Sequence, residues 1–271
     1  DVVNFSNPAA PVLITSISMA PYGGINSIVV KNGIVAVAIE NANPQLNGSV
    51  VFFDQNGVFQ NQVIVGTMPD MITFNQDYTK VLTANEGEPN ATYSADPEGS
   101  VSIINISGGI TALTQANVTN ISLSQYNGQE VALRAQGIRI FTSSASVAQD
   151  LEPEYIAVST DNTKAYVTLQ ENNALLTIDL LTNTIVSLTP FGYSSYAAGS
   201  NNALDASDQS GMVLITGDLP IKGAYMPDAM TYKTIGSQGY LFTANEGDSR
   251  EFGSVIDANR ISSATFNLLD A

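Results

Sequence analysis

The sequence of 271 residues contains no cysteine, histidine or tryptophan. Zinc sites of the usual kind need thiolate or imidazole ligands, and Ser–His–Asp or Cys–His catalysis needs an imidazole base. Both are therefore excluded within this chain. Any metal that the chain binds must be held by oxygen atoms, which favours Ca²⁺ or Mg²⁺ over zinc and other softer metals.

Basic residues are scarce, because 9 Lys and Arg stand against 25 Asp and Glu, for a net charge of −16. Nucleic acids and anionic membrane surfaces attract clustered Lys and Arg, so neither is expected as a partner. No apolar run approaches the roughly 18 residues of a membrane-spanning helix, so we expect no direct membrane insertion of this segment. The acidic balance fits cation binding, or a surface that acids keep soluble.

Short runs rich in Val, Ile, Tyr and Thr alternate with turns that contain Gly, Asn and Asp, a pattern typical of β-strands. Four segments follow one plan: a strand, a turn, and a second strand that ends in a glutamate. These segments begin at Ile25, Pro69, Pro153 and Pro227, and their glutamates are Glu40, Glu86, Glu171 and Glu246. A third strand follows in the first three. Repeats of about 40–45 residues with three or four strands indicate the blades of a β-propeller.

We therefore predict one all-β domain over residues 1–271, a β-propeller of which the chain supplies about four to five blades. Two insertions interrupt the repeat, at about residues 110–150 and about residues 190–212. The first contains a short helix, which Asn127 is expected to cap and Gly137 to end. The alternative, a β-sandwich of unrelated hairpins, does not explain why the same residues return at the same strand ends.

Acidic residues mark the same edge of each predicted blade. Antiparallel neighbours bring the start of one strand beside the end of the next, which predicts three carboxylate pairs. The pairs are Asp70 with Glu86, Glu154 with Glu171, and Asp228 with Glu246. Because the first strand of a blade lines the central channel, these pairs are expected around one mouth of it. Close carboxylates repel one another unless a cation or a base lies between them.

This edge is therefore either a Ca²⁺ site or a set of separate contacts between blades. The candidate metal ligands are carboxylates at the strand ends and in adjacent loops: Glu86, Glu88, Asp96, Glu98, Asp150, Glu152, Glu154, Glu171, Asp228, Glu246 and Asp248. None of them follows the EF-hand spacing. Arg250 and Arg134 are candidate contacts for an anionic ligand, and a salt bridge is the alternative for Arg250.

Several long strings resemble one protein family: "GEPNATYSADPEGSVSIINIS", "NGQEVALRAQGIRIF", "SVAQDLEPEYIAVSTDNTKAYVTLQENNALLTIDL", "NALDASD" and "TANEGDSR". They are similar to the choice-of-anchor I family of extracellular β-propellers, which includes relatives of the mesenchyme-specific cell-surface glycoproteins of biomineralising animals. The resemblance implies export, attachment to the cell surface, and a lactonase-like propeller of seven blades when complete. It also implies that the chain is a fragment, incomplete at both ends.

Taken together, the sequence predicts an extracellular or cell-surface binding module, with Ca²⁺ as its cofactor and an adhesion, surface-layer or matrix role. Its expected partners are other extracellular or surface proteins, or copies of itself. Two alternatives stay open. One is a calcium-dependent phosphoesterase, similar to the alkaline phosphatases or phytases, which the scarcity of bases beside the acids disfavours. The other is a structural subunit of an extracellular filament or array.

Overall fold

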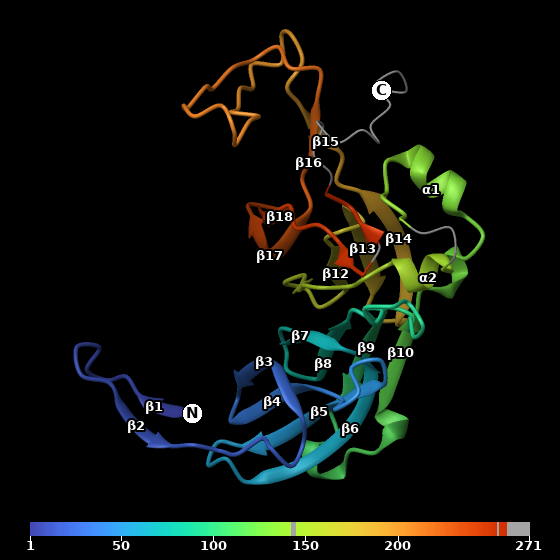
Figure 1. Cartoon of the computed structure of the whole chain (residues 1–271). Coiled ribbons are helices and arrows are strands. Elements are labelled where there is room, and N and C mark those ends of the chain that lie inside the picture. The colour runs from blue at the N-terminus through green and yellow to red at the C-terminus, as the bar shows by residue number, and fades with distance from the viewer. Residues whose placement is uncertain (142–144, 254, 259–271) are drawn as a thin grey trace.

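The structure is a computed structural model that describes residues 1–141, 145–253 and 255–258. It is built mainly from antiparallel β-sheets that follow one another along the chain (Figure 1). The first sheet consists of β3 (Gly24–Lys31), β4 (Ile34–Glu40), β5 (Asn47–Asp54) and β6 (Phe59–Thr67). The second consists of β7 (Pro69–Phe74), β8 (Lys80–Asn85), β9 (Ser100–Asn105) and β10 (Val118–Ser122). The third consists of β11 (Ile156–Val158), β12 (Lys164–Leu169), β13 (Ala174–Asp179) and β14 (Thr184–Pro190).

Each of these sheets is a meander in which every strand pairs with the strand that follows it. A fourth unit contains two strands, β17 (Pro227–Ile235) and β18 (Gln238–Asn245). The first strands of consecutive units lie side by side: β3 contacts β7, β7 contacts β11, and β11 contacts β17. Four-stranded meanders whose first strands gather at a common centre are the blades of a β-propeller. The predicted fold class is confirmed.

Polar side chains close the turns between the first two strands of a blade, as the sequence predicts. In the second sheet, the Asn75 side chain accepts hydrogen bonds from the backbone N–H groups of Thr79 and Lys80, at 3.0 and 2.8 Å. In the third sheet, Ser159 Oγ accepts from Lys164 N at 2.9 Å. These local bonds satisfy backbone donors at the turn and fix where the second strand begins.

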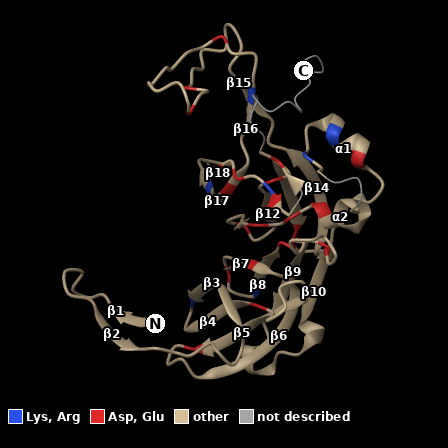
Figure 2. Cartoon of the chain, in the orientation of Figure 1, with Lys and Arg blue, Asp and Glu red and all other residues tan. Residues whose placement is uncertain are grey.

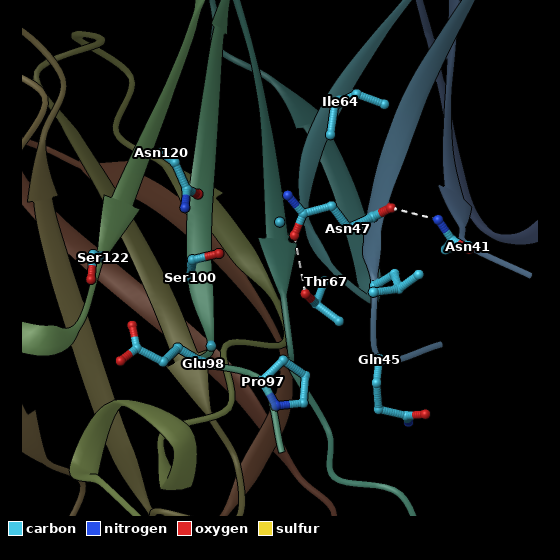
Figure 3. Close-up of a pocket in the computed structure, with 13 residues that line it drawn as sticks. Asn41, Gln45, Asn47, Ile64, Thr67, Pro97, Glu98, Ser100, Asn120 and Ser122 are labelled. Carbon is cyan, nitrogen blue, oxygen red and sulfur yellow. Dashed lines mark hydrogen bonds between the residues drawn. The ribbon is translucent and has the colours of Figure 1, made fainter. Parts of the chain in front are cut away.

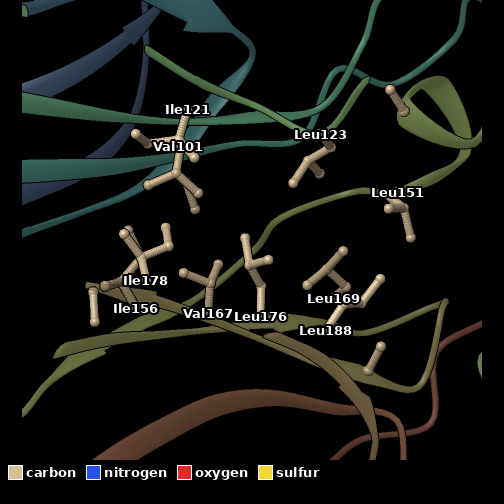
Figure 4. Packing of buried hydrophobic residues seen from close by; sticks show 14 of the residues in the cluster. Val101, Ile121, Leu123, Leu151, Ile156, Val167, Leu169, Leu176, Ile178 and Leu188 are labelled. Carbon is tan, nitrogen blue, oxygen red and sulfur yellow. The ribbon is translucent and has the colours of Figure 1, made fainter. Parts of the chain in front are cut away.

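The hydrophobic core lies between adjacent blades. Side chains of the second sheet, such as Val101 and Ile121, face Ile156, Val167 and Leu176 of the third sheet (Figure 4). A second cluster, which includes Phe52, joins the first sheet to the second. The first sheet is covered by the second sheet on one face and by Ile17, Met19 and Tyr22 on the other, so its strand β5 is buried at successive positions instead of alternating between core and solvent.

Several short elements lie outside the four-stranded sheets. They are β1 (Val2–Asn4), β2 (Val12–Thr15), η1 (Ile110–Ala112), η2 (Gln115–Asn117), η3 (Ser124–Tyr126), α1 (Glu130–Gln136), α2 (Val147–Asp150), β15 (Tyr193–Ser195), β16 (Lys222–Ala224), β19 (Glu251–Phe252) and β20 (Val255–Ile256). In Figure 1 the β1–β2 hairpin and the arm that begins with β15 and returns through β16 both project from the sheets.

The structure locates the first of the two interruptions more closely. The predicted stretch of about residues 110–150 includes β10, the fourth strand of the second sheet, so its helices α1 and α2 follow that strand. The predicted helix forms as α1 and ends at Gly137, which has a φ of 97°. The prediction that Asn127 caps this helix is wrong: Gln129 is the N-cap, and Asn127 Oδ1 instead accepts from Ala148 N at 2.9 Å.

Candidate cation-binding site

The two copies of Thr-Ala-Asn-Glu-Gly end equivalent strands, β8 and β18. Each copy meets a Met-Pro-Asp turn whose methionine has a positive φ, 49° at Met68 and 39° at Met226. The carbonyl of Met68 accepts from Glu86 N at 3.0 Å, and that of Met226 accepts from Gly247 N at 3.2 Å. This turn starts a first strand directly beside the end of the second, so the aspartate that follows each proline lies near the glutamate of the repeat.

The third sheet reaches the same arrangement by a different local sequence. Glu154 N donates to Thr168 O, and Thr168 N donates to Tyr155 O, both at 2.9 Å, so strand pairing continues beyond β11 toward Pro153. Thr168 Oγ1 also donates to Asp228 O at 2.9 Å, which ties the third blade to the fourth. These bonds bring Glu154 beside Glu171, and their carboxyl groups are hydrogen-bonded to each other.

Carboxylates from all these strand ends form one group, which we call the acidic rim. It consists of Asp70, Glu86, Glu88, Glu152, Glu154, Glu171, Asp228 and Glu246. Burial is the largest cause of their raised pKa values, and their charges add to it: Asp70 raises the pKa of Glu86, and Glu246 raises the pKa of Asp228. Burial, and then the charge of Asp228 on the fourth unit, raise the pKa of Asp70 on the second sheet. Figure 2 shows acidic residues gathered where the sheets meet.

Burial and mutual repulsion raise the pKa of several rim carboxylates. Burial, and then the charges of Glu88 and Asp70, raise the pKa of Glu86 to about 10. Burial and the charge of Glu171 raise the pKa of Glu88 to about 7, although Arg250 opposes this. The pKa of Glu154 is raised first by burial and then by Glu171. Such groups hold protons near neutral pH unless a cation lies among them and favours their ionised form.

At one side of the rim, Arg250 forms buried ion pairs. Its Nη2 lies 2.5 Å from Glu152 Oε2, and its Nη1 lies 3.1 Å from Asp150 Oδ1. The Arg250 side chain also lies over the Phe141 ring, with Cζ 4.9 Å from the ring centroid. Asp150 is fixed from a second direction by Phe141 N, which donates to both of its carboxylate oxygens at 3.1 and 3.0 Å. The salt-bridge alternative thus describes the observed contacts of Arg250.

Asn172 holds the same network together, although it was not among the predicted site residues. Its Nδ2 donates to the carbonyls of Asp150 and Arg139, at 2.8 and 2.9 Å, and its Oδ1 accepts from Glu152 N at 3.2 Å. Its position after Gln-Glu, at the end of the second strand of a blade, is the signal that could have identified it. The Arg139 guanidinium forms a further ion pair with Asp257.

The rim supplies the carboxylate oxygens that a hard cation needs, but these oxygens do not surround a common centre. Among the described residues, no three carboxylates stand in ready-made metal-binding geometry. Two rim oxygens, Glu171 Oε2 and Glu152 Oε1, are buried without a hydrogen-bond partner in the part of the chain that the structure describes. A buried carboxylate oxygen without a partner is costly, and a cation would satisfy it. Carboxylate oxygens are the ligands that Ca²⁺ prefers.

The other predicted site residues lie beside the rim or away from it. Asp96 is near Arg250, which lowers its pKa, whereas burial, the larger effect, raises that pKa to about 6. Glu98 is exposed and lines a cavity between the first and second sheets. Asp248 is exposed and accepts from Ser249 N at 2.7 Å. Arg134 lies on α1 and donates to the carbonyl of Ile140 at 2.9 Å.

Comparison with protein families identifies the chain, because the model of the choice-of-anchor I domain matches residues 1–270. The chain belongs to the choice-of-anchor I family. Choice-of-anchor domains are associated with cell-surface proteins, so this domain is a surface-associated propeller module. None of the helices in the described residues combines the length and hydropathy needed to cross a membrane.

Solved structures resemble the choice-of-anchor I domain at low sequence identity. A functionally unknown protein from Desulfotomaculum acetoxidans is 12% identical with a TM-score of 0.45, over 69% of this chain and 49% of that one. The β-propeller domain of Cps50 (Swd1) from Myceliophteria thermophila is 9% identical with a TM-score of 0.44, over 70% and 52%. The RRP9 WD40 repeats are 9% identical with a TM-score of 0.37, over 61% and 38%. The chain thus spans about half or less of the length of each. A comparison with curated proteins gave no match.

Proposed function

We propose that this choice-of-anchor I domain is an extracellular propeller that binds Ca²⁺ at the acidic rim and serves adhesion, a surface layer or a matrix. The observation that carries the proposal is the contact between Glu154 and Glu171. Their carboxyl groups are hydrogen-bonded to each other, and Glu171 Oε2 is buried without a partner among the described residues. Two carboxylates this close need either a shared proton or a shared cation.

Calcium is the cation that this arrangement favours. Ca²⁺ accepts six to eight oxygen ligands in flexible geometry, whereas Mg²⁺ needs near-ideal octahedral coordination. The rim supplies carboxylates from three blades on strand ends and loops, and within the described residues they form no closed cage. Glu154 and Glu171 would hold the ion, with Glu86 and Asp228 within range of their charges. Neutralising the rim would then stabilise the blades against one another.

Partners are proposed on the same basis. A Ca²⁺ ion bound at the rim, at one mouth of the propeller channel, would have coordination positions left for oxygen atoms of another molecule. With a net charge of −16, two copies of the chain repel unless a cation lies between them. We therefore propose that calcium promotes contact with other surface proteins or with further copies of this chain.

Calcium titration followed by calorimetry and thermal melting tests the proposal. We expect CaCl₂, and not MgCl₂ at the same concentration, to raise the melting temperature, and a chelator to reverse the effect. The double variant Glu154→Gln, Glu171→Gln should lose the response. Glu130→Gln is the matched control, because Glu130 lies on α1 and its carboxylate accepts only from Gly128 N among its described contacts. A variant that still binds Ca²⁺ with unchanged affinity would overturn the assignment to the rim.

A chromogenic phosphate ester separates this proposal from the phosphoesterase alternative. The rim lacks a free guanidinium to hold phosphate, since the described contacts of Arg250 are with Asp150 and Glu152. We therefore expect no turnover with Ca²⁺ present. Turnover that a chelator stops, and that Glu86→Gln and Glu246→Gln abolish, would overturn the binding-module proposal in favour of a metal-dependent hydrolase.

A further inference from the structure

A cavity of about 670 Å³ lies between the first and second sheets, apart from the acidic rim. Its walls come from the loop before β5, from β5 and β6, and from the segments that contain Glu98 and β10 (Figure 3). The side chains that matter for its chemistry are Gln45, Leu46, Asn47, Ile64, Glu98 and Asn120. Ligand cavities in proteins commonly measure about 300–1,000 Å³, so this one has room for a small organic molecule.

The cavity is shaped by specific contacts between the two sheets. The Gln115 side chain accepts from Ile64 N at 3.0 Å and donates to Ile64 O at 2.8 Å, which satisfies the outer edge of β6. Gly66 lets β6 approach β9 closely, because a Cβ at that position would lie 2.3 Å from Ser100 Oγ. Gly66 N donates to Ser102 Oγ at 3.2 Å. The walls are thus fixed by hydrogen bonds from both blades.

The polar groups that line the cavity keep bonding capacity for a ligand. Asn120 Oδ1 accepts from Ser102 Oγ at 3.2 Å, and Asn47 Oδ1 accepts from Thr67 Oγ1 at 3.3 Å. Within the described part of the chain, these bonds use the amide oxygens, so both amide nitrogens remain to donate. Figure 3 shows Asn47 and Asn120 on different walls, with Glu98 on a third side as an acceptor.

We propose that this cavity binds a neutral oligosaccharide. Sugar hydroxyls both donate and accept, and they match a wall of amides and hydroxyls with one carboxylate. None of the described residues that line the cavity is basic, which disfavours phosphates, sulfates and acidic sugars. Leu46 and Ile64, 54% and 46% exposed, offer apolar contact for the C–H face of a sugar ring. A calcium ion has no part in this contact.

The test uses the whole chain, produced without glycosylation, in the presence of a chelator. Neutral oligosaccharides of glucose, mannose, galactose and N-acetylglucosamine are titrated while the side-chain amide signals of Asn and Gln are followed by NMR. We expect at least one to shift the signals of Asn47, Asn120 and Gln45. The double variant Gln45→Ala, Glu98→Gln should weaken that binding by about tenfold or more, as the loss of one or two ligand hydrogen bonds predicts.

Gln60→Ala is the matched control, because Gln60 lies on β6 outside the cavity and donates to Val58 O. It should change the affinity less than about twofold. None of the three substituted side chains belongs to a hydrophobic core cluster, and thermal melting checks that each variant is folded. The proposal would be overturned if no sugar shifted these amide signals, or if the double variant bound the sugar with unchanged affinity. It would also be overturned if binding required Ca²⁺. The last outcome would leave calcium binding at the acidic rim intact, so the two proposals fail separately.

Discussion

Arg250 and Glu152 form a buried ion pair, with Nη2 2.5 Å from Oε2, and their side chains are 1% and 3% exposed. The same guanidinium pairs with Asp150, 100 positions earlier in the chain. The segment that follows β18 is thereby anchored to the end of α2. Glu152 belongs to the acidic rim, so this anchor also fixes one side of the candidate cation site.

Replacing Arg250 with methionine should destabilise the domain by about 3–5 kcal/mol, because two buried carboxylates lose their counter-charge. Chemical denaturation measures the effect. Arg134→Met is the matched control: Arg134 is exposed on α1, and its loss should cost under about 1 kcal/mol. Equal effects of the two substitutions would show that the buried ion pairs contribute nothing to stability.

The two repeat copies provide a second prediction, because they place one asparagine in two environments. In both copies a threonine donates to the asparagine side chain, Thr83 to Asn85 at 2.9 Å and Thr243 to Asn245 at 3.1 Å. Asn85 is fully buried and also donates to Ser102 Oγ at 3.0 Å, whereas Asn245 is exposed.

Asn85→Ala should therefore cost about 1–3 kcal/mol of stability, since buried partners lose their hydrogen bonds. Asn245→Ala should change stability by no more than about 0.5 kcal/mol. Urea denaturation of both variants compares them directly. A larger loss at Asn245 than at Asn85 would contradict the assignment of buried and exposed copies.

The strand ends were predictable from the sequence because the repeat itself carries the information. Pro69 and Pro227 begin first strands, and Glu86 and Glu246 follow second strands, as the periodicity indicates. Antiparallel pairing then requires that the acids meet, whatever the details of packing. The convergence of carboxylates across blades follows from the propeller fold, in which all first strands gather at the centre.

Other parts of the site depend on contacts that no local pattern encodes. Arg250 reaches Asp150 across 100 residues, and nothing near either residue predicts that pairing. The cavity walls around Asn47 and Asn120 come from two blades, so they exist only after the blades pack. The N-cap of α1 was also unpredictable, because Asn127 is used by Ala148 of the next helix.

Glu154→Gln should raise the melting temperature in the presence of a chelator. Without a cation, burial and the neighbouring Glu171 raise the pKa of Glu154, so its carboxyl group must take up a proton when the domain folds. An amide is neutral at every pH, so it removes the cost of this proton uptake and still donates a hydrogen bond to Glu171. Differential scanning calorimetry measures the shift, with Glu130→Gln as control, for which no shift is expected. A lower melting temperature for Glu154→Gln in chelator would show that the folded domain does not disfavour the ionised form of Glu154.

The rim also predicts that stability without calcium decreases as pH rises. The pKa of Glu88 is raised from 4.5 to about 7 and that of Glu86 to about 10, so the folded state keeps protons that the unfolded chain has released. This stabilising contribution is complete below about pH 4.5 and is lost as pH rises through about 7 and toward 10. Hydrogen bonds lower the pKa of Asp161 to about 2. Its titration therefore affects stability only below about pH 4 and does not change the pH dependence above that value.

In chelator, the melting temperature should thus fall between about pH 5 and about pH 8. Calcium should flatten this dependence, because the ion stabilises the ionised carboxylates, and its effect on the melting temperature should be larger at the higher pH. Glu88→Gln removes one of the titrating groups and should also reduce the slope. A melting temperature that rises over this range in chelator would mean that the rim carboxylates are ionised in the folded domain without any cation.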